Sequence, residues 1–284
     1  MIPAFARYLF LLLVALPGLH PRPAIAADDP GPSVVIRLQQ RFDDIRPECT
    51  DGSAAINCNG VLARYVREWS DPTFWNPSQK DIDRNGVSFI YLRADVGNEI
   101  LPGGAGLIMR EQGAPAEQPL AIRCVFPSDA ASDIRPQSCA SQQFPLPCHL
   151  SGVVDLPTWQ AHFAEHGRRN ACYFEPTAHW FQFNIEVREH FPNPSERRLW
   201  NEVVIAPWPQ DVPEQLPLEA LYYMDVPGYQ NLEHARHMQD NFIRATGKFV
   251  PVVRVELTHP DQVFFYVPRD QSQPYLEGLG VSTE

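Results

Sequence analysis

Lysine and positive charge are scarce in this chain. Only two lysines, Lys80 and Lys248, occur among 23 basic residues, against 34 acidic residues. The formal net charge is −11 over 284 residues. Because nucleic acids bind basic surfaces, this deficit argues against a nucleic acid as the main partner. The preference for arginine fits either a GC-rich genome or a use of arginine as a planar clamp for phosphate or carboxylate.

Several motifs of well-known enzyme classes are also missing. The sequence contains no C-x-x-C pair, no G-x-G-x-x-G turn, no Walker P-loop and no G-x-S-x-G elbow. These absences argue against the usual zinc and redox spacings, dinucleotide-binding Rossmann domains, P-loop NTPases and α/β-hydrolases. Internal repeats and recognisable linkers are absent too.

Long apolar runs are limited to one, at the N-terminus. Arg7 precedes the run over residues 8–16, and a small-x-small cleavage site follows at residues 24–26. The run is short for a membrane span, so residues 1–26 are predicted to be a secretory signal peptide. Its removal takes away Arg7 and Arg22 and no acidic residue. We therefore expect an extracellular or periplasmic protein that makes no membrane contact after cleavage.

Proline is abundant, and its abundance limits the fold class. The chain has 29 prolines, while 44% of residues are hydrophobic and 11% aromatic. Interior proline breaks helices, which excludes a long-helix bundle, yet the apolar content suffices for a core. We expect one disulfide-braced α+β domain with a mixed or antiparallel sheet over residues 27–270 and a flexible tail over residues 271–284.

Hydrophobic periodicity predicts more strands than helices, without regular alternation, which favours α+β over a doubly wound sheet. Helices are expected over residues 34–45, 156–166 and 233–246. Strands are expected over residues 60–66, 86–93, 106–109, 120–126, 199–205, 220–224, 249–257 and 263–267. Residues 180–187 fit both a strand and a helix, and residues 70–85 read as a polar loop.

The six cysteines are even in number, and export favours their pairing as disulfides. We expect Cys49–Cys58 as a local loop closure, with Cys139–Cys148 and Cys124–Cys172 as the other pairs. The chain also matches H-x-x-E-H at residues 162–166, an inverted zinc-protease motif. Because Gly167 ends the helix at once, an amphipathic helix with two exposed histidines is the preferred interpretation, and we predict no metal.

Three predicted strands each carry a polar residue suited to cleaving a nicotinamide nucleotide. Arg64, Ser88 and Glu202 follow the order used by ADP-ribosyltransferases and NAD glycohydrolases. Breaking the nicotinamide–ribose bond passes through an oxocarbenium-like state, which a carboxylate stabilises. Arginine suits the pyrophosphate, and serine can hold both side chains in place. These three are the candidate catalytic residues. The candidate substrate-binding residues are Arg64, Trp75, Phe89, Tyr91 and Arg93, whose aromatic members could sandwich nicotinamide.

Six segments resemble the halovibrin family of secreted bacterial proteins. They are residues 58–64, 75–78, 86–93, 124–130 (with Asp133, Arg135 and Cys139), 201–202 and 216–223. The resemblance implies a secreted NAD glycohydrolase or ADP-ribosyltransferase, with NAD as substrate, no bound cofactor and an ADP-ribosyltransferase-like fold. It also implies that a host or competitor protein could be the acceptor.

The sequence departs from the transferase pattern at two places. Trp200 stands two positions before Glu202, where transferases to protein carry Glu or Gln, and Phe89 and Ile90 follow Ser88 in place of Thr and Ser. The first departure favours hydrolysis by water over transfer to protein. Two alternatives stay open: a non-enzymatic secreted binding or colonisation factor, and a zinc hydrolase at His162 and His166.

Overall fold

The computed structural model describes residues 30–97, 101, 104–109, 120–130, 139, 146–167, 172–191, 200–225 and 231–269. The predicted signal peptide and C-terminal tail lie outside these ranges, as do Asp133 and Arg135 of the middle block.

Within these ranges, eight strands form one sheet in the order β4-β5-β2-β1-β3-β6-β7-β8. Neighbouring strands are antiparallel except β6 and β7, which run parallel and are joined through a helix, so the sheet is mixed. The strands are β1 (Val61–Tyr65), β2 (Val87–Leu92), β3 (Ala105–Met109), β4 (Ile122–Phe126), β5 (Glu202–Ile205), β6 (Leu218–Tyr223), β7 (Val252–Val255) and β8 (Phe264–Tyr266).

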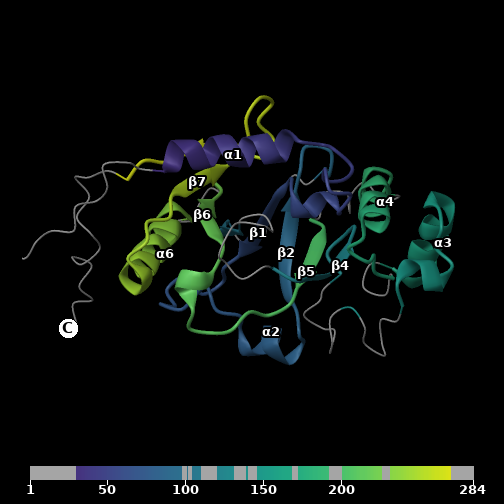
Figure 1. Ribbon diagram of the computed structural model, residues 1–284, viewed down its shortest axis with the longest axis horizontal. Coiled ribbons are helices and arrows are strands. Elements are labelled where there is room, and N and C mark those ends of the chain that lie inside the picture. Colours follow the sequence, from purple (N-terminus) through teal and green to yellow (C-terminus); the bar gives the residue numbers. More distant parts are fainter. Residues whose placement is uncertain are drawn as a thin grey trace, which may run out of the picture.

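Helices cover both faces of this sheet (Figure 1). The α-helices are α1 (Gly31–Asp43), α2 (Gln79–Asp83), α3 (Leu156–His166), α4 (Ala178–Glu189) and α6 (Asn231–Thr246). Single 3-10 turns are η1 (Ala55–Asn57), η3 (Cys148–Ser151) and η4 (Pro213–Gln215). The expected α+β class with a mixed sheet is therefore confirmed.

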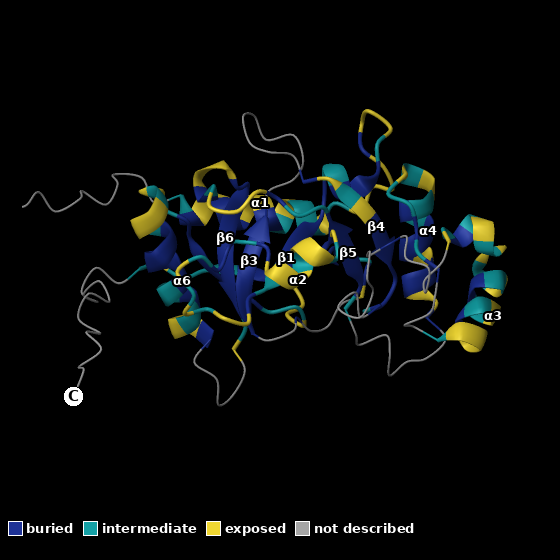
Figure 2. Ribbon diagram, turned by 90° about the horizontal axis from the view of Figure 1, so that it is seen from below, coloured by how far each residue is buried: buried dark blue, intermediate teal, exposed yellow. Residues whose placement is uncertain are grey.

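The core consists of two main layers, one on each face of the sheet. Helix α1 buries Val34, Val35 and Leu38 against the face that carries Ala63 and Ile90. Helices α4 and α6 pack their apolar residues with the opposite face, in a larger cluster that includes Phe89 and Tyr91 from β2. Figure 2 shows the strands as the buried centre and α3 as a more exposed helix at one end. Adjacent residues of one strand thus lie in different layers.

Local sequence signals explain where the helices begin and end. Asp155 caps α3 by accepting a hydrogen bond from the Thr158 amide, and the Thr158 hydroxyl accepts one from the Asp155 backbone N–H, which is a capping box. Gly167 ends α3 at φ 69°, and Gly247 follows α6 at φ 68°, a backbone region that glycine adopts without strain.

The structure resolves one ambiguous segment and corrects the expectation for another. Residues 180–187, which fitted both patterns, lie in helix α4, where Phe181, Ile185 and Arg188 are buried at helical spacing and Thr177 caps the first turn. The polar loop over residues 70–85 contains the short helix α2. Its Ser78 and Asp81 form a second capping box, which stabilises a turn that hydrophobic periodicity does not reveal.

Three disulfides join the six cysteines, and one of the three predicted pairings is confirmed. Cys49 pairs with Cys58 as expected. The predicted Cys139–Cys148 and Cys124–Cys172 pairs are wrong, because Cys124 bonds to Cys139 and Cys148 bonds to Cys172. The physical reason is the fold: Tyr173 and Phe174 run beside Pro147 and Val125, which brings Cys172 next to Cys148.

Three disulfides are consistent with a protein of an oxidising compartment, as export predicts. None of the helices in the described ranges is long and apolar enough to cross a bilayer.

Candidate functional site

Ser88 and Glu202 meet on one face of the sheet. Strands β2 and β5 are antiparallel neighbours in which Ser88 lies opposite Val204. Glu202 is two residues before Val204 and therefore shares its face. The Ser88 hydroxyl donates a hydrogen bond of 2.7 Å to Glu202 Oε1, across 114 residues of sequence. This contact joins two of the three predicted catalytic residues.

The Glu202 carboxylate is also held from its other side. The backbone N–H of Ala130, just beyond β4, donates a hydrogen bond of 2.9 Å to Oε2. Glu202 as a whole is 3% exposed, while Ser88 is half-buried. The carboxylate therefore sits at the inner end of the pair with two donors fixing its plane, and Ser88 lies on the more open side. Charge-assisted bonds of this kind orient a carboxylate strongly.

Arg64 does not join this pair. Ala63 lies opposite Ile90, so Ala63 shares the face of Ile90 and Ser88, and Arg64 points to the other face. There its guanidinium forms an ion pair of 2.8 Å with Asp81 of α2 and lies 5.7 Å from the ring centre of Trp208. Burial lowers the pKa of Arg64, and the Asp81 carboxylate opposes that shift. Of the three expected residues, the structure brings together Ser88 and Glu202 only.

The three aromatic candidates lie in the protein core. Trp75, Phe89 and Tyr91 are 4%, 1% and 2% exposed. Phe89 and Tyr91 lie on the same face of the sheet as Arg64, whereas Ser88 lies on the other face. Trp75 packs edge-on against Phe242 of α6. Burial raises the pKa of Tyr91, whose hydroxyl donates to Asn59 Oδ1 at 2.8 Å. In this structure these rings pack the fold and present no open stacking surface.

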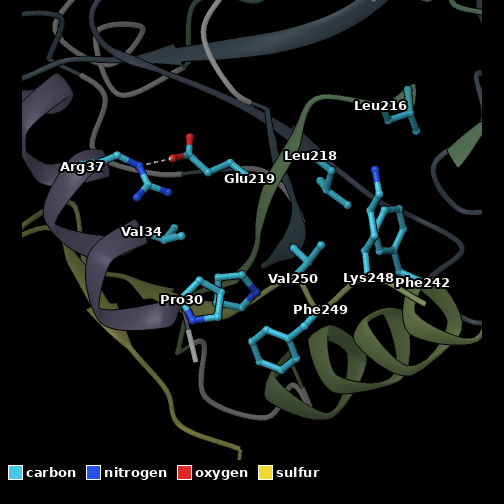
Figure 3. Close-up of a pocket in the computed structure, with 11 residues that line it drawn as sticks. Pro30, Val34, Arg37, Leu216, Leu218, Glu219, Phe242, Lys248, Phe249 and Val250 are labelled. Carbon is cyan, nitrogen blue, oxygen red and sulfur yellow. Dashed lines mark hydrogen bonds and ion pairs between the residues drawn. The ribbon is translucent and has the colours of Figure 1, made fainter. Parts of the chain in front are cut away.

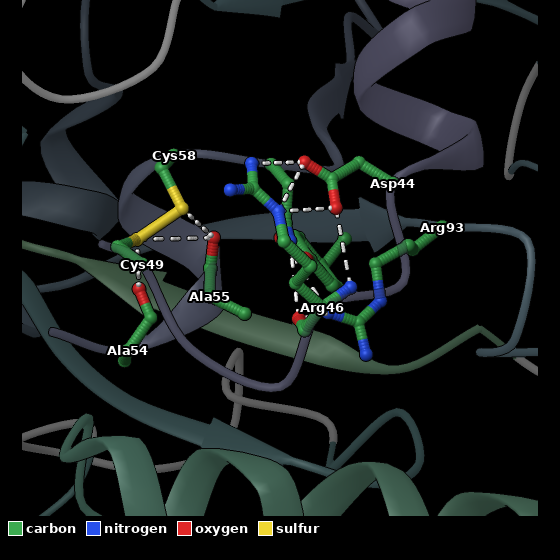
Figure 4. Close-up of polar contacts among 9 residues, drawn as sticks. Asp44, Arg46, Cys49, Ala54, Ala55, Cys58 and Arg93 are labelled. Atoms are coloured by element: carbon green, nitrogen blue, oxygen red, sulfur yellow. Dashed lines mark hydrogen bonds and ion pairs between the residues drawn. A yellow bond between two sulfur atoms is a disulfide. The ribbon is translucent and has the colours of Figure 1, made fainter. Parts of the chain in front are cut away.

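Arg93 also has partners within the fold (Figure 4). Its guanidinium donates to both Asp95 oxygens, at 2.6 and 2.8 Å, and to the backbone carbonyl of Arg46 at 2.9 Å. Arg46 in turn pairs with Asp44, and the Cys49–Cys58 disulfide lies further along the same loop. Arg93 thus fastens the loop after α1 to the end of β2.

Asn201 is a site neighbour that the residue-type analysis did not assign a role. Its side-chain oxygen accepts from the Tyr91 backbone N–H at 2.8 Å, and its side-chain nitrogen donates to the Tyr91 carbonyl at 2.8 Å. The amide therefore imitates a strand residue and fixes the start of β5 against β2. In the sequence, Asn201 lay within the strand expected over residues 199–205 and in the segment 201–202 that resembles the halovibrin family, and neither feature indicated this bonding.

The H-x-x-E-H motif forms no metal-binding group in the described residues. The His162 Nε2 atom accepts a hydrogen bond of 3.1 Å from the Cys172 amide, so this nitrogen has a structural role. His166 is exposed and lies 3.8 Å from Glu165, whereas His162 is half-buried, so the expectation of two exposed histidines is wrong for His162. The described part of the chain contains no set of three side chains placed to hold a metal ion.

No family model matches the chain, and no curated protein sequence matches it significantly.

Proposed function

We propose that the protein is a secreted enzyme that cleaves NAD at the nicotinamide–ribose bond. Glu202 would face the ribose, and Ser88 would position its carboxylate. The observation that carries the proposal is the 2.7 Å hydrogen bond between these two residues, which were predicted from different strands. The resemblance to halovibrins supports the same activity, and an ADP-ribosyltransferase-like fold belongs to the proposal.

The chemistry assigns each group a distinct task. When the glycosidic bond breaks, its electron pair leaves with nicotinamide and positive charge develops on the ribose. A fixed carboxylate stabilises that charge because it needs no reorganisation during the reaction. Water then adds to the anomeric carbon and loses a proton, giving ADP-ribose. The donors from Ser88 and Ala130 hold Glu202 in one orientation for this step.

Arg64 has no part in this proposal, because it faces the opposite side of the sheet. The proposed reaction is hydrolysis, since Trp200 occupies the position that carries Glu or Gln in transferases to protein. Transfer to a host or competitor protein is the related reaction. The two are distinguished by incubating the enzyme with NAD alone, where only hydrolysis forms ADP-ribose without an acceptor.

Replacing Glu202 tests the proposal at the residue that carries it. Glu202→Gln keeps the shape and removes the charge, so we expect nicotinamide release to fall by about a hundredfold or more. The matched control is Glu256→Gln, which alters a carboxylate paired with Arg254 after β7, five places from β5 in the sheet. Glu256→Gln should keep the wild-type rate. Full activity of folded Glu202→Gln would exclude the assignment.

A second candidate function is a non-enzymatic secreted binding or colonisation factor. It is favoured by the near-complete burial of Glu202, both of whose oxygens have donors, and by the separate position of Arg64. A polar pair of this kind can serve the fold alone. In that case wild-type protein leaves NAD intact, and Glu202→Gln lowers only the free energy of unfolding, by about 1–3 kcal/mol.

A further inference from the structure

A β-bulge in strand β4 sets one arginine apart from its neighbours. Ile122 pairs with Ile205 of β5. The next pair joins Cys124 and Val204, so Arg123 is the extra residue. Arg123 is exposed, while the three β4 residues that follow it are buried. Bulges re-aim side chains and are frequent beside functional sites.

Arg123 lies on the face of the sheet that carries Ser88. Ile122 packs against the core cluster that contains Phe89. Because successive residues of a strand point to opposite faces, Arg123 lies on the face away from Phe89. Ser88 lies on that face too, since it directly precedes Phe89 in β2. Arg123 therefore has the orientation that Arg64 lacks.

The Arg123 guanidinium reaches across β5, which lies between β4 and β2. It donates a hydrogen bond of 2.8 Å to the side-chain oxygen of Asn85, in the turn before β2. Asn85 has φ 57°, a left-handed backbone that asparagine adopts more readily than most residues. Ser88 is three residues after Asn85, a span of about 10 Å at most. The guanidinium is thus held near the open side of the Ser88–Glu202 pair.

Several arginines of the described chain have a carboxylate partner, whereas Arg123 forms no ion pair with any described residue. Arg37 pairs with Glu219 at the pocket between α1 and β6 (Figure 3). Arg64 pairs with Asp81. The amide oxygen that Arg123 contacts does not neutralise its charge. A guanidinium has five N–H donors, and this one is suited to a bidentate contact with phosphate.

We propose that Arg123 binds the phosphate next to the reacting ribose, so that the site selects phosphorylated nicotinamide nucleotides over nicotinamide riboside. This inference rests on the proposed function, because it places the ribose at Glu202. In NAD, the ribose ring and one CH2–O link separate the anomeric carbon from the nearest phosphate. A carboxylate at the ribose with an arginine a short distance away matches that arrangement.

Steady-state kinetics with NAD and nicotinamide riboside test the assignment. For the wild-type protein, the KM for NAD should be about tenfold or more below the KM for the riboside, because hydrogen bonds between charged groups are strong. Arg123→Gln should raise the KM for NAD about tenfold or more and leave kcat nearly unchanged, as expected for loss of binding alone. Its kinetics with the riboside should match those of the wild type.

Arg244→Gln is the matched control. Arg244 is also exposed and also bonds to an asparagine side chain, that of Asn241, but it lies on α6 at the opposite face of the sheet. Arg244→Gln should keep the wild-type KM for NAD. Calorimetry with ADP-ribose gives a readout that needs no catalysis. Wild-type protein should bind ADP-ribose about tenfold or more tightly than Arg123→Gln does.

The two readouts separate this inference from the proposed reaction. If NAD stays intact while ADP-ribose binding depends on Arg123, the proposed reaction fails and the phosphate site is supported. If NAD is cleaved and folded Arg123→Gln keeps the wild-type KM and ADP-ribose affinity, Arg123 only fastens the turn before β2 and the inference is overturned. A wild-type protein that does not bind ADP-ribose would overturn it as well.

Discussion

Trp69 contacts two histidines of α6. The Trp69 ring stacks on His234 with ring centres 4.1 Å apart and meets His237 edge-on at 5.3 Å. Burial lowers the pKa of both histidines from the ordinary value of 6.5. The folded protein therefore prefers the neutral rings, and the unfolded chain binds protons more readily.

This preference makes stability depend on pH. Because the folded pKa values lie below the unfolded ones, the contribution is present above about pH 6.5 and is lost as the pH falls through that value. We expect the free energy of unfolding to decrease between pH 7 and pH 5, and the double variant His234→Gln/His237→Gln to show a shallower decrease. Urea unfolding followed at several pH values measures this.

The same titration contains its own control. Above pH 7.5 both histidines are neutral in either state, so the wild-type and variant curves should run parallel there. A variant that keeps the full wild-type decrease below pH 6.5 would show that these two rings do not cause it.

At the residue scale, the sequence predicted which types of side chain are candidates for the site. It did not predict on which face of the sheet each of them lies. Ser88 and Glu202 were selected by chemistry, and the structure brings them together. Arg64 was selected by the same reasoning and faces the other side. A shift of one residue along a strand moves a side chain to the opposite face, and register depends on pairings that one sequence does not display.

Among the elements, the entry to β1 depends on a glycine. Gly60 has φ +67°, and a Cβ there would lie 2.2 Å from the Tyr91 ring. Gly52 has φ +78° with nothing within 4 Å. At both positions the backbone conformation would be strained for any other residue. Only at Gly60 would an added Cβ also clash with a neighbouring side chain.

We therefore expect Gly60→Ala to lower the free energy of unfolding by more than Gly52→Ala does. The difference should be about 1–3 kcal/mol, which is the usual cost of overpacking a core. Chemical denaturation of both variants measures it. Equal losses would mean that backbone strain alone decides both positions and that Tyr91 yields easily.

Strands were the best-predicted elements, because alternation and β-branched residues mark them directly. Helix α4 was ambiguous because residues 180–187 alternate with period two, while Trp180, Phe183 and Val187 also form a stripe at helical spacing. The N-cap at Thr177 and the burial of Arg188 on the inner side of the helix are features of an α-helix, which is what the structure forms there. Helix α2 has no buried residue and no hydrophobic signal. Its capping box was present in the sequence but lay in a segment that read as a polar loop.

For the whole molecule, the disulfides brace separate loops. Cys148–Cys172 joins residues 24 apart and Cys49–Cys58 joins residues 9 apart. Longer closed loops restrict the unfolded chain more, so Cys148→Ala/Cys172→Ala should cost roughly 3 kcal/mol and Cys49→Ala/Cys58→Ala less. Urea unfolding of the two double variants compares them. A larger loss from the shorter loop would contradict this order.

The local disulfide was predictable because its cysteines are close in sequence. The other two pairs were not, since their choice depends on residues 172–174 returning beside Val125 and Pro147. The fold class and the presence of disulfides thus follow from composition and periodicity, whereas the choice between a mixed and an antiparallel sheet, the disulfide pairing and the face of each side chain depend on tertiary contacts.

The most direct test of the account is the release of nicotinamide from NAD by the purified mature protein. The disulfide-bonded chain is incubated with NAD and no protein acceptor, and the products are separated by chromatography. The account predicts nicotinamide and ADP-ribose in equal amounts, formed at a rate proportional to protein concentration. NAD that stays intact with the folded protein, under conditions where a known NAD glycohydrolase consumes it, would contradict the account.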